Sequence, residues 1–246
     1  MYNKIWLMVP TYKRPEWLVR LIVSAIETAE NVSNIGLCIC YNVKDKSTVS
    51  FLQSEDFKTL TSGISLLTVE ESTRQPNLSL YFNMMYDEVV KNHGSKNIVS
   101  MIGDDMVFVT KGYDRRILDK INETNGRGIV WCNDDYIAKD KCPVNLFVTT
   151  ELVQTTGKPF MCPEFRADMI DVVWGTVAKA TGLQCYLGDV VIKHLHSTSL
   201  PAHDDTFQRL APIQKLSNGK LNHVIAQTHA MIISGNLIAA GVGEWQ

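Results

Sequence analysis

The segment IVSMIGDDMVF, residues 98–108, contains a short apolar run that stops at Gly103 and the adjacent carboxylates of Asp104 and Asp105. An apolar run bounded by turn residues predicts a buried strand, here over 97–102. Neighbouring carboxylates repel each other, so their position just past a buried strand indicates either a turn or a bound cation. Ligands gather beyond the carboxyl ends of strands in α/β sheets, which makes these acids the first candidates for a functional site.

Short apolar runs alternate with helical patterns on both sides of this segment. Strands are predicted over 4–9, 35–41, 64–69 and 128–132, and helices from Pro15 onward, over 47–53 and over 78–91. Within the last of these helices, we expect Leu80, Met84, Val89 and Val90 to face inward. This alternation predicts an α/β fold with a mostly parallel central sheet flanked by helices.

The C-terminal half is less regular. A helix is predicted over about 168–181, ended by Gly182, followed by a strand over 190–196 and a C-terminal helical region. The sequence has no internal repeat, low-complexity tract or long flexible linker. We therefore expect one domain over residues 1–246.

Composition limits the classes of function. The chain has 246 residues, 45% of them hydrophobic, with 24 basic and 26 acidic side chains. This balance creates no global positive field, so nucleic acid is neither required nor excluded as a partner. Six cysteines without a C-x-x-C pair indicate buried thiols in a reducing compartment. With no signal-peptide pattern and no run of about 20 apolar residues, we expect no membrane span and a cytoplasmic protein.

Two further segments have the right chemistry to join the acidic pair. Residues 10–14, PTYKR, follow the first predicted strand and should lie at the same edge of the sheet. His194 and His196 alternate on a predicted strand, so both can point to one side. Carboxylate and imidazole together suit Mn²⁺ and similar ions, so we expect one of these histidines to be a metal ligand.

These segments also resemble a known family. VPTYKRPEWLVRLIVSAI (9–26), Asn83 in its helix, MIGDDMVF (101–108), ADMIDVVWGTVAKATG (167–182) and the later His194 occur in the order found in nucleotide-sugar-dependent glycosyltransferases of the GT-A fold, family 2-like. The resemblance covers about residues 4 to 210. It implies a GT-A-type domain with a nucleotide-sugar-binding half, 1–135, and an acceptor half with a C-terminal helical region, 136–246.

The resemblance also implies roles for individual residues. Asp105, with His194 or His196, would hold Mn²⁺ or Mg²⁺, and Asp171 would be the general base, with Asp168 as a competing candidate. Trp174 and Asp135 are expected on the acceptor side. The nucleotide-diphosphate sugar, with a uridine diphosphate sugar favoured, would contact Pro10, Thr11, Tyr12, Arg14, Arg74, Asn83 and Asp104.

Two positions depart from the family's pattern. The usual Asp-x-Asp motif is Gly-Asp-Asp here, so the ribose contact of its first acid passes to Asp104 or is lost. The acceptor helix has Ile170–Asp171 where the family has a Glu–Asp pair, which leaves the identity of the base open between Asp168 and Asp171.

The expected reaction is a single displacement that inverts the anomeric centre. The segments DVVWGTVAKATG (171–182), VVIKHLHS (190–197) and HDDTF (203–207) also resemble small glycosyltransferases of tailed bacteriophages. This resemblance favours a 5-hydroxymethylpyrimidine in phage DNA as the acceptor and the host cytoplasm as the location. A surface glycan or protein hydroxyl is the alternative acceptor. A non-catalytic nucleotide-binding scaffold stays open as a second class of function. A two-metal nucleotidyltransferase would need further acids beside Asp104 and Asp105, and the sequence offers no convincing third acid nearby.

Overall fold

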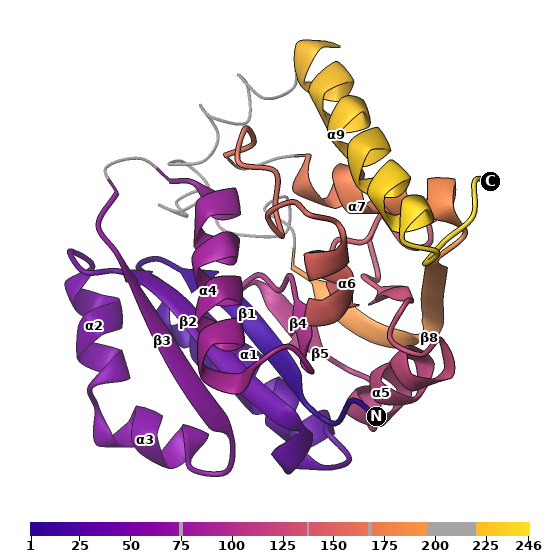
Figure 1. Ribbon diagram of the computed structural model, residues 1–246. Helices are drawn as coiled ribbons and strands as arrows, with labels where there is room; N and C mark the ends of the chain where they lie inside the picture. Colours follow the sequence, from indigo (N-terminus) through magenta and orange to yellow (C-terminus); the bar gives the residue numbers. More distant parts are fainter. Residues whose placement is uncertain (74–75, 137, 167–168, 196–219) are drawn as a thin grey trace.

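The computed structural model describes residues 1–73, 76–136, 138–166, 169–195 and 220–246 (Figure 1). Of the predicted site residues, Arg74, Asp168 and His196 lie outside this part of the chain. Among the described helices, none is long and apolar enough to cross a membrane.

An eight-stranded sheet forms the centre of the molecule. Its order is β3 (Ser65–Glu71), β2 (Ile35–Asn42), β1 (Ile5–Thr11), β4 (Ile98–Ser100), β7 (Leu146–Thr149), β6 (Ile129–Asn133), β8 (Gln184–His194) and β5 (Met106–Phe108). Strands β3, β2, β1 and β4 run parallel, as do β6 and β8. Strand β7 is antiparallel to both its neighbours, and β5 is antiparallel to β8. The predicted mostly parallel sheet is confirmed.

Helices cover both faces of this sheet because successive side chains of a strand point to opposite sides. In β1, Trp6 and Met8 belong to one core with α4 (Leu78–His93), α6 (Thr150–Thr155), α7 (Ile170–Thr181) and α9 (Lys220–Ala239). Ile5, Leu7 and Val9 belong to the other core, with α1 (Pro15–Thr28), α3 (Glu55–Thr61) and α5 (Tyr113–Glu123). Helix α9 lies against α7 (Figure 1).

Local sequence explains several helix boundaries. Pro15 starts α1, where its missing N–H costs nothing, and Asp45 caps α2 (Lys46–Leu52) by accepting from the backbone N–H of Thr48. Asn77 caps α4 in the same way, and Gly182 ends α7 in the left-handed conformation. A short 3₁₀ turn, Val32–Asn34, precedes β2.

The structure differs from the predicted elements in three respects. Leu80 is 38% exposed, so the inward position predicted for it is wrong; Ser79, Tyr81, Phe82, Met85, Tyr86 and Val89 form the buried side of α4. Strand β8 begins at Gln184, earlier than predicted, and α7 is described from Ile170. Strands β5 and β7 and helices α3, α5 and α6 were not predicted.

The strand directions bring many chemically active residues to one edge. The carboxyl ends of β1, β2, β3, β4, β6 and β8 all point the same way, and the antiparallel β5 and β7 begin at that edge. Residues that follow β1, β4, β6 and β8 therefore meet there.

Candidate active site

A cavity of about 720 Å³ opens at this edge of the sheet. Its walls come from the ends of β1, β3 and β8, the loops after β4 and β6, and the first turns of α4 and α7. Among the predicted residues, the cavity is lined by Pro10, Thr11, Tyr12, Arg14, Asp104, Asp105, Asp171 and His194. Residues 10–14 and 104–105 therefore meet at one edge of the sheet, as their positions after two predicted strands led us to expect, and they remain predicted site residues.

Asp104 ties the loop after β1 to the loop after β4. Its carboxylate is buried, with one oxygen accepting from the Thr11 hydroxyl at 2.8 Å and the other from the Arg14 guanidinium at 2.5 Å. The left-handed Lys13 (φ 57°) gives the loop its turn, and its N–H donates to Asp45 at 2.5 Å. Because both Asp104 oxygens are engaged within the protein, Asp104 positions Arg14; its predicted ribose contact stays a prediction.

Asp105 and His194 form a pair that faces the cavity. The antiparallel pairing of β5 with β8 sets Met106 beside His194, and the Leu195 N–H donates to the carbonyl of Asp105. The nearest side-chain atoms, Oδ2 of Asp105 and Nε2 of His194, are 3.5 Å apart, and each side chain is 23% exposed. These two residues are distant in sequence and are neighbours only through the sheet.

The two groups shift each other's pKa. Burial alone would raise the pKa of the Asp105 carboxyl, but the nearby His194 ring, through hydrogen bonding and charge, and Arg14 lower it. Burial alone would lower the pKa of His194, whereas Asp105, followed by the charges of Asp134 and Asp171, raises it. The arrangement favours a carboxylate beside an imidazolium when no other cation is bound.

Gly103 explains why the motif is Gly-Asp-Asp. A Cβ at this position would lie 2.4 Å from Oδ1 of Asp105, well inside van der Waals contact. Only glycine leaves this carboxylate in its observed place. The glycine is therefore needed for close packing against the side chain of Asp105, and not for a special backbone conformation.

The cavity is acidic. Five carboxylates line it, from Glu71, Asp104, Asp105, Asp134 and Asp171, against the cations Arg14 and Lys141 and the titratable His194. A carboxylate oxygen and an imidazole nitrogen that face one space fit Mn²⁺ or Mg²⁺, which commonly take one or two protein ligands and complete their shell with phosphates and water. The residues present therefore fit the expected ion.

Asp171 lies in the first turn of α7, whose N-terminal residues Met169 to Val172 all line the cavity. One oxygen of its carboxylate accepts from the Cys142 thiol at 3.3 Å, and the other accepts from the N–H of Val172 at 2.9 Å. Met169 has φ 71° and precedes the helix without a side-chain cap. A carboxylate held in this way can accept a proton from a group in the cavity.

Three other predicted residues do not line the cavity. Both ends of the Asn83 amide bond the backbone of Met161, at 3.0 and 2.7 Å. Trp174 is 1% exposed, and its indole N–H donates to the carbonyl of Phe160. Asp135 has φ 52° and pairs with Lys193 at 3.3 Å near the surface. The first two bond to the backbone within the protein, and the third bonds to a partly exposed lysine.

Asp134, rather than Asp135, lines the cavity on this side. It is buried, and its carboxylate accepts from the N–H groups of Ala138 and Lys139, so it closes the loop that follows β6. The N–H of His194 donates to the carbonyl of Asp134, which joins this loop to the end of β8.

Several lining residues were missed by the sequence reasoning. Glu71 ends β3 and accepts from the Asn42 amide at 2.6 Å and from Thr73, whose hydroxyl is also 2.8 Å from the Tyr81 hydroxyl. The position of Glu71 at the end of a predicted strand could have identified it as a candidate site residue. In the structure Glu70 is exposed and Glu71 is buried, so Glu71 is the one that faces inward. Cys142 and Tyr136, in the loop between β6 and β7, carried no such signal.

The sequence matches no protein-family model, and it matches no curated protein sequence. Its structure resembles TarS from S. aureus, with a TM-score of 0.62 at 13% identity over 95% of this chain and 43% of that one. The TarS 1–349 structure in complex with UDP-GlcNAc gives a TM-score of 0.61 at 12% identity, covering 96% of this chain and 73% of that one.

A mannosyltransferase from Pyrobaculum calidifontis, PcManGT, in complex with GDP-Man and Mn²⁺, gives a TM-score of 0.60 at 13% identity. It covers 100% of this chain and 77% of that one. The present chain thus spans less than half the length of the S. aureus TarS chain and about three quarters of the shorter structures. At these identities the similarity concerns the fold, and the chain shares its GT-A-type fold with these proteins.

Proposed function

We propose that the chain is a metal-dependent glycosyltransferase that transfers the sugar of a nucleoside-diphosphate sugar to an acceptor hydroxyl. The observation that carries this proposal is the Asp105–His194 pair in a cavity lined by five carboxylates. A diphosphate cannot enter so acidic a space unless positive charge is supplied with it. A divalent ion held by this pair meets that need.

Asp105 and His194 would hold Mn²⁺ or Mg²⁺. Bound there, the ion would neutralise the diphosphate and stabilise the charge that develops as the nucleoside diphosphate departs. A metal ligand must be a neutral imidazole, so the ion would compete with a proton at His194. His196 stays a predicted alternative ligand.

The donor would lie along the end of β1. Thr11, Tyr12 and Arg14 face the cavity there, and Asp104 holds Arg14 so that its charge remains beside the proposed diphosphate site. We favour a uridine diphosphate sugar. The fold similarity to structures that contain UDP-GlcNAc or GDP-Man with Mn²⁺ supports a nucleotide-sugar donor and a divalent ion in general.

Asp171 would act as the general base. Its carboxylate accepts the proton of the acceptor hydroxyl, whose oxygen bonds the anomeric carbon while the bond from that carbon to the diphosphate oxygen breaks. The bonding electrons leave with the diphosphate, and attack from the opposite side inverts the anomeric centre. Cys142 holds the Asp171 carboxylate in position. Asp168 remains the competing candidate for the base.

For the acceptor we propose a 5-hydroxymethylpyrimidine in DNA, on the strength of the resemblance to small phage glycosyltransferases. The chain has a formal charge of −2, which works against DNA binding because neutralisation of phosphates supplies much of such affinity. A surface glycan or a protein hydroxyl is therefore the alternative that the same assay must include.

Ligand binding is tested first, by thermal unfolding. Mn²⁺ and UDP together should raise the melting temperature of the wild type, because a ligand that binds only the native state stabilises it. The Asp105→Ala variant should lose this rise, while Asp119→Ala, an exposed change on α5, should keep it. No rise for the wild type with any of a panel of nucleoside diphosphates would overturn the proposal.

Turnover is tested next, with Mn²⁺, a panel of nucleotide sugars and three acceptors: hydroxymethylcytosine DNA, a glycan and a serine peptide. Digestion and mass measurement should reveal a nucleoside heavier by one sugar residue. Transfer to the glycan or the peptide alone would refute DNA as the acceptor and would still support a glycosyltransferase. Binding without any transfer or donor hydrolysis would instead support the non-catalytic scaffold.

A further inference from the structure

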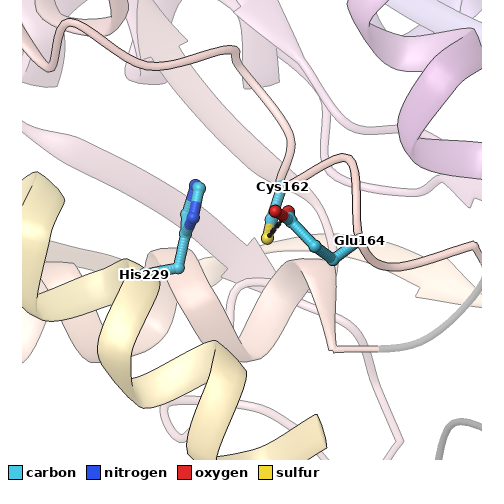
Figure 2. Close-up of side chains that lie close together, drawn as sticks. All are labelled: Cys162, Glu164 and His229. Carbon is cyan, nitrogen blue, oxygen red and sulfur yellow. Dashed lines mark hydrogen bonds between the residues drawn. The ribbon is translucent and has the colours of Figure 1, made fainter.

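A second group of metal-binding side chains lies outside the cavity. Cys162 and Glu164 belong to the loop between α6 and α7, and His229 lies on α9 (Figure 2). One ligand atom from each lies within 4.8 Å of the other two. Among the described residues this is the one group in which at least three such side chains come so close.

The imidazole of His229 has a buried nitrogen that could bind a metal ion. Within the described part of the chain, its Nε2 atom is buried and has no hydrogen-bond partner. An unpaired buried polar atom costs about 1–3 kcal/mol, so it is uncommon without a water or an ion beside it. Burial lowers the pKa of His229, which leaves a neutral ring with a lone pair to donate to a metal.

The loop that presents the other two ligands is well fixed. Met161, next to Cys162, is held by the amide of Asn83, and Phe160 accepts from the Trp174 indole. Pro163 separates the two ligands and restricts the backbone between them. On the opposite side, Asn236 of α9 donates to the carbonyl of Thr156 at 2.6 Å. The loop is therefore held by α4 and α7, and the bond from Asn236 joins the residue just before it to α9.

Charge and geometry suit zinc. A thiolate, a carboxylate and a neutral imidazole give two negative charges, which balance one divalent cation. The Cys162 thiol donates to the Glu164 carboxylate at 2.9 Å, so the proton that a metal would replace lies between two of its ligands. Ligand atoms around zinc lie roughly 3.5 Å apart, and the three ligand atoms here lie within 4.8 Å of one another, so small side-chain adjustments are enough. Glu164 is exposed, and rotation of its side chain allows this.

We propose that Cys162, Glu164 and His229 form a zinc site that fastens α9 to the loop leading into α7. Binding releases the thiol proton of Cys162 to solvent and leaves one position on the ion for water. The site differs in kind from the Asp105–His194 pair, because its thiolate selects zinc over Mg²⁺ or Mn²⁺. The proposal is independent of the transferase reaction.

The site has a structural consequence for the cavity. Met169 and Ile170, a few residues further along the sequence, line the cavity wall beside Asp171. Because α9 also packs against α7, zinc would hold this wall from outside the cavity. Its expected effect is on stability, and it takes no part in the chemical step.

The first test uses the full chain, Co²⁺ in place of zinc, and the absorption band of a cobalt–thiolate bond. The wild type should give this band at one equivalent of Co²⁺, and zinc should abolish it by displacement. Asp105→Ala should keep the band, because a carboxylate–imidazole pair cannot produce it. Absence of the band from the wild type would overturn the proposal.

The second test measures zinc content after dialysis in the presence of excess Mg²⁺. Cys162→Ser, Glu164→Gln and His229→Gln should each weaken zinc binding by more than about 100-fold, since even indirect partners of a metal contribute 10- to 100-fold. The matched controls are Cys185→Ser and His223→Gln, the latter an exposed histidine on the same helix. One zinc per chain in Glu164→Gln, an exposed change that should not disturb folding, would refute the site.

Discussion

The role of Gly103 can be tested by a single methyl group. In Gly103→Ala the new Cβ would lie 2.4 Å from Oδ1 of Asp105, and ordinary contact begins near 3.4 Å. The carboxylate must therefore retreat by about 1 Å from the position in which it faces His194. Displacements of that size commonly cost about 100-fold in rate. This corresponds to about 2.7 kcal/mol of transition-state stabilisation.

The stability of the fold should hardly change in this variant. Gly103 does not have a positive φ, so alanine meets no backbone strain there, and the obstacle is the end of a side chain. We expect a free energy of unfolding within about 1 kcal/mol of the wild type. The control is Gly235→Ala, in α9, where a Cβ meets nothing within 4 Å and should add up to about 1 kcal/mol of stability.

The assay compares Mn²⁺ affinity in the presence of UDP, by calorimetry, with the rate of sugar transfer or donor hydrolysis. Gly103→Ala should lose both by about 100-fold, while Gly235→Ala retains both. If Gly103→Ala bound Mn²⁺ and turned over within a factor of about three of the wild type, the placement of Asp105 would not depend on the glycine. Close packing against the Asp105 carboxylate would then not be the reason for glycine at the first position of the Gly-Asp-Asp motif.

Three further predictions concern other parts of the chain. Asp171→Asn should lower kcat by about 10² to 10⁴ and leave the donor KM nearly unchanged, because only the proton acceptor is lost; a variant with normal kcat would exclude Asp171 as the base. Burial would raise the pKa of Asp45, but hydrogen bonds from Thr48, Ser47 and the backbone of Lys13 outweigh it and lower that pKa. The stabilisation by this carboxylate is therefore present above its ordinary pKa of about 4 and lost as the pH falls below it, so the unfolding free energies of the wild type and Asp45→Asn should converge in acid. Asp114→Ala should lower the free energy of unfolding by about 2–3 kcal/mol, because it removes a buried acceptor from the N–H groups of Glu30 and Asn31. The control is Asp119→Ala, which breaks an exposed ion pair with Arg115 and should cost less than about 1 kcal/mol. Urea unfolding measures both changes.

The first part of the fold was readable because β1 and β2 are long and almost continuously apolar. Residues 5–9 and 35–40 are buried on both faces, and such runs between helical patterns have few other interpretations. Strands β5 and β7 were not predicted because three or four residues contain no measurable period. Their pairing with distant strands, which the local sequence does not encode, makes them strands.

The sequence predicted which loops meet at the cavity, but it did not always predict which residue of a loop lines it. Asp134 and Asp135 both follow β6, but the left-handed backbone of Asp135 sends its side chain toward Lys193. Trp174 shows the same limit on a helix, because its spacing fits either a binding face or the core. In the structure it is buried, and its indole N–H donates to the carbonyl of Phe160. Turn geometry and packing decide such cases, and neither is local.

Because β8 supplies the imidazole and the carboxylate of Asp105 lies directly before β5, the proposed ion site would be completed only when the chain has been synthesised almost to residue 195 and β8 has paired with β5. Strands β1 to β4 could assemble earlier on the ribosome, with Asp105 at their border and no partner for it. Binding of Mn²⁺ would then report the last step of sheet assembly. Two fragments of the chain, divided before β8, should bind the ion only after they reassociate.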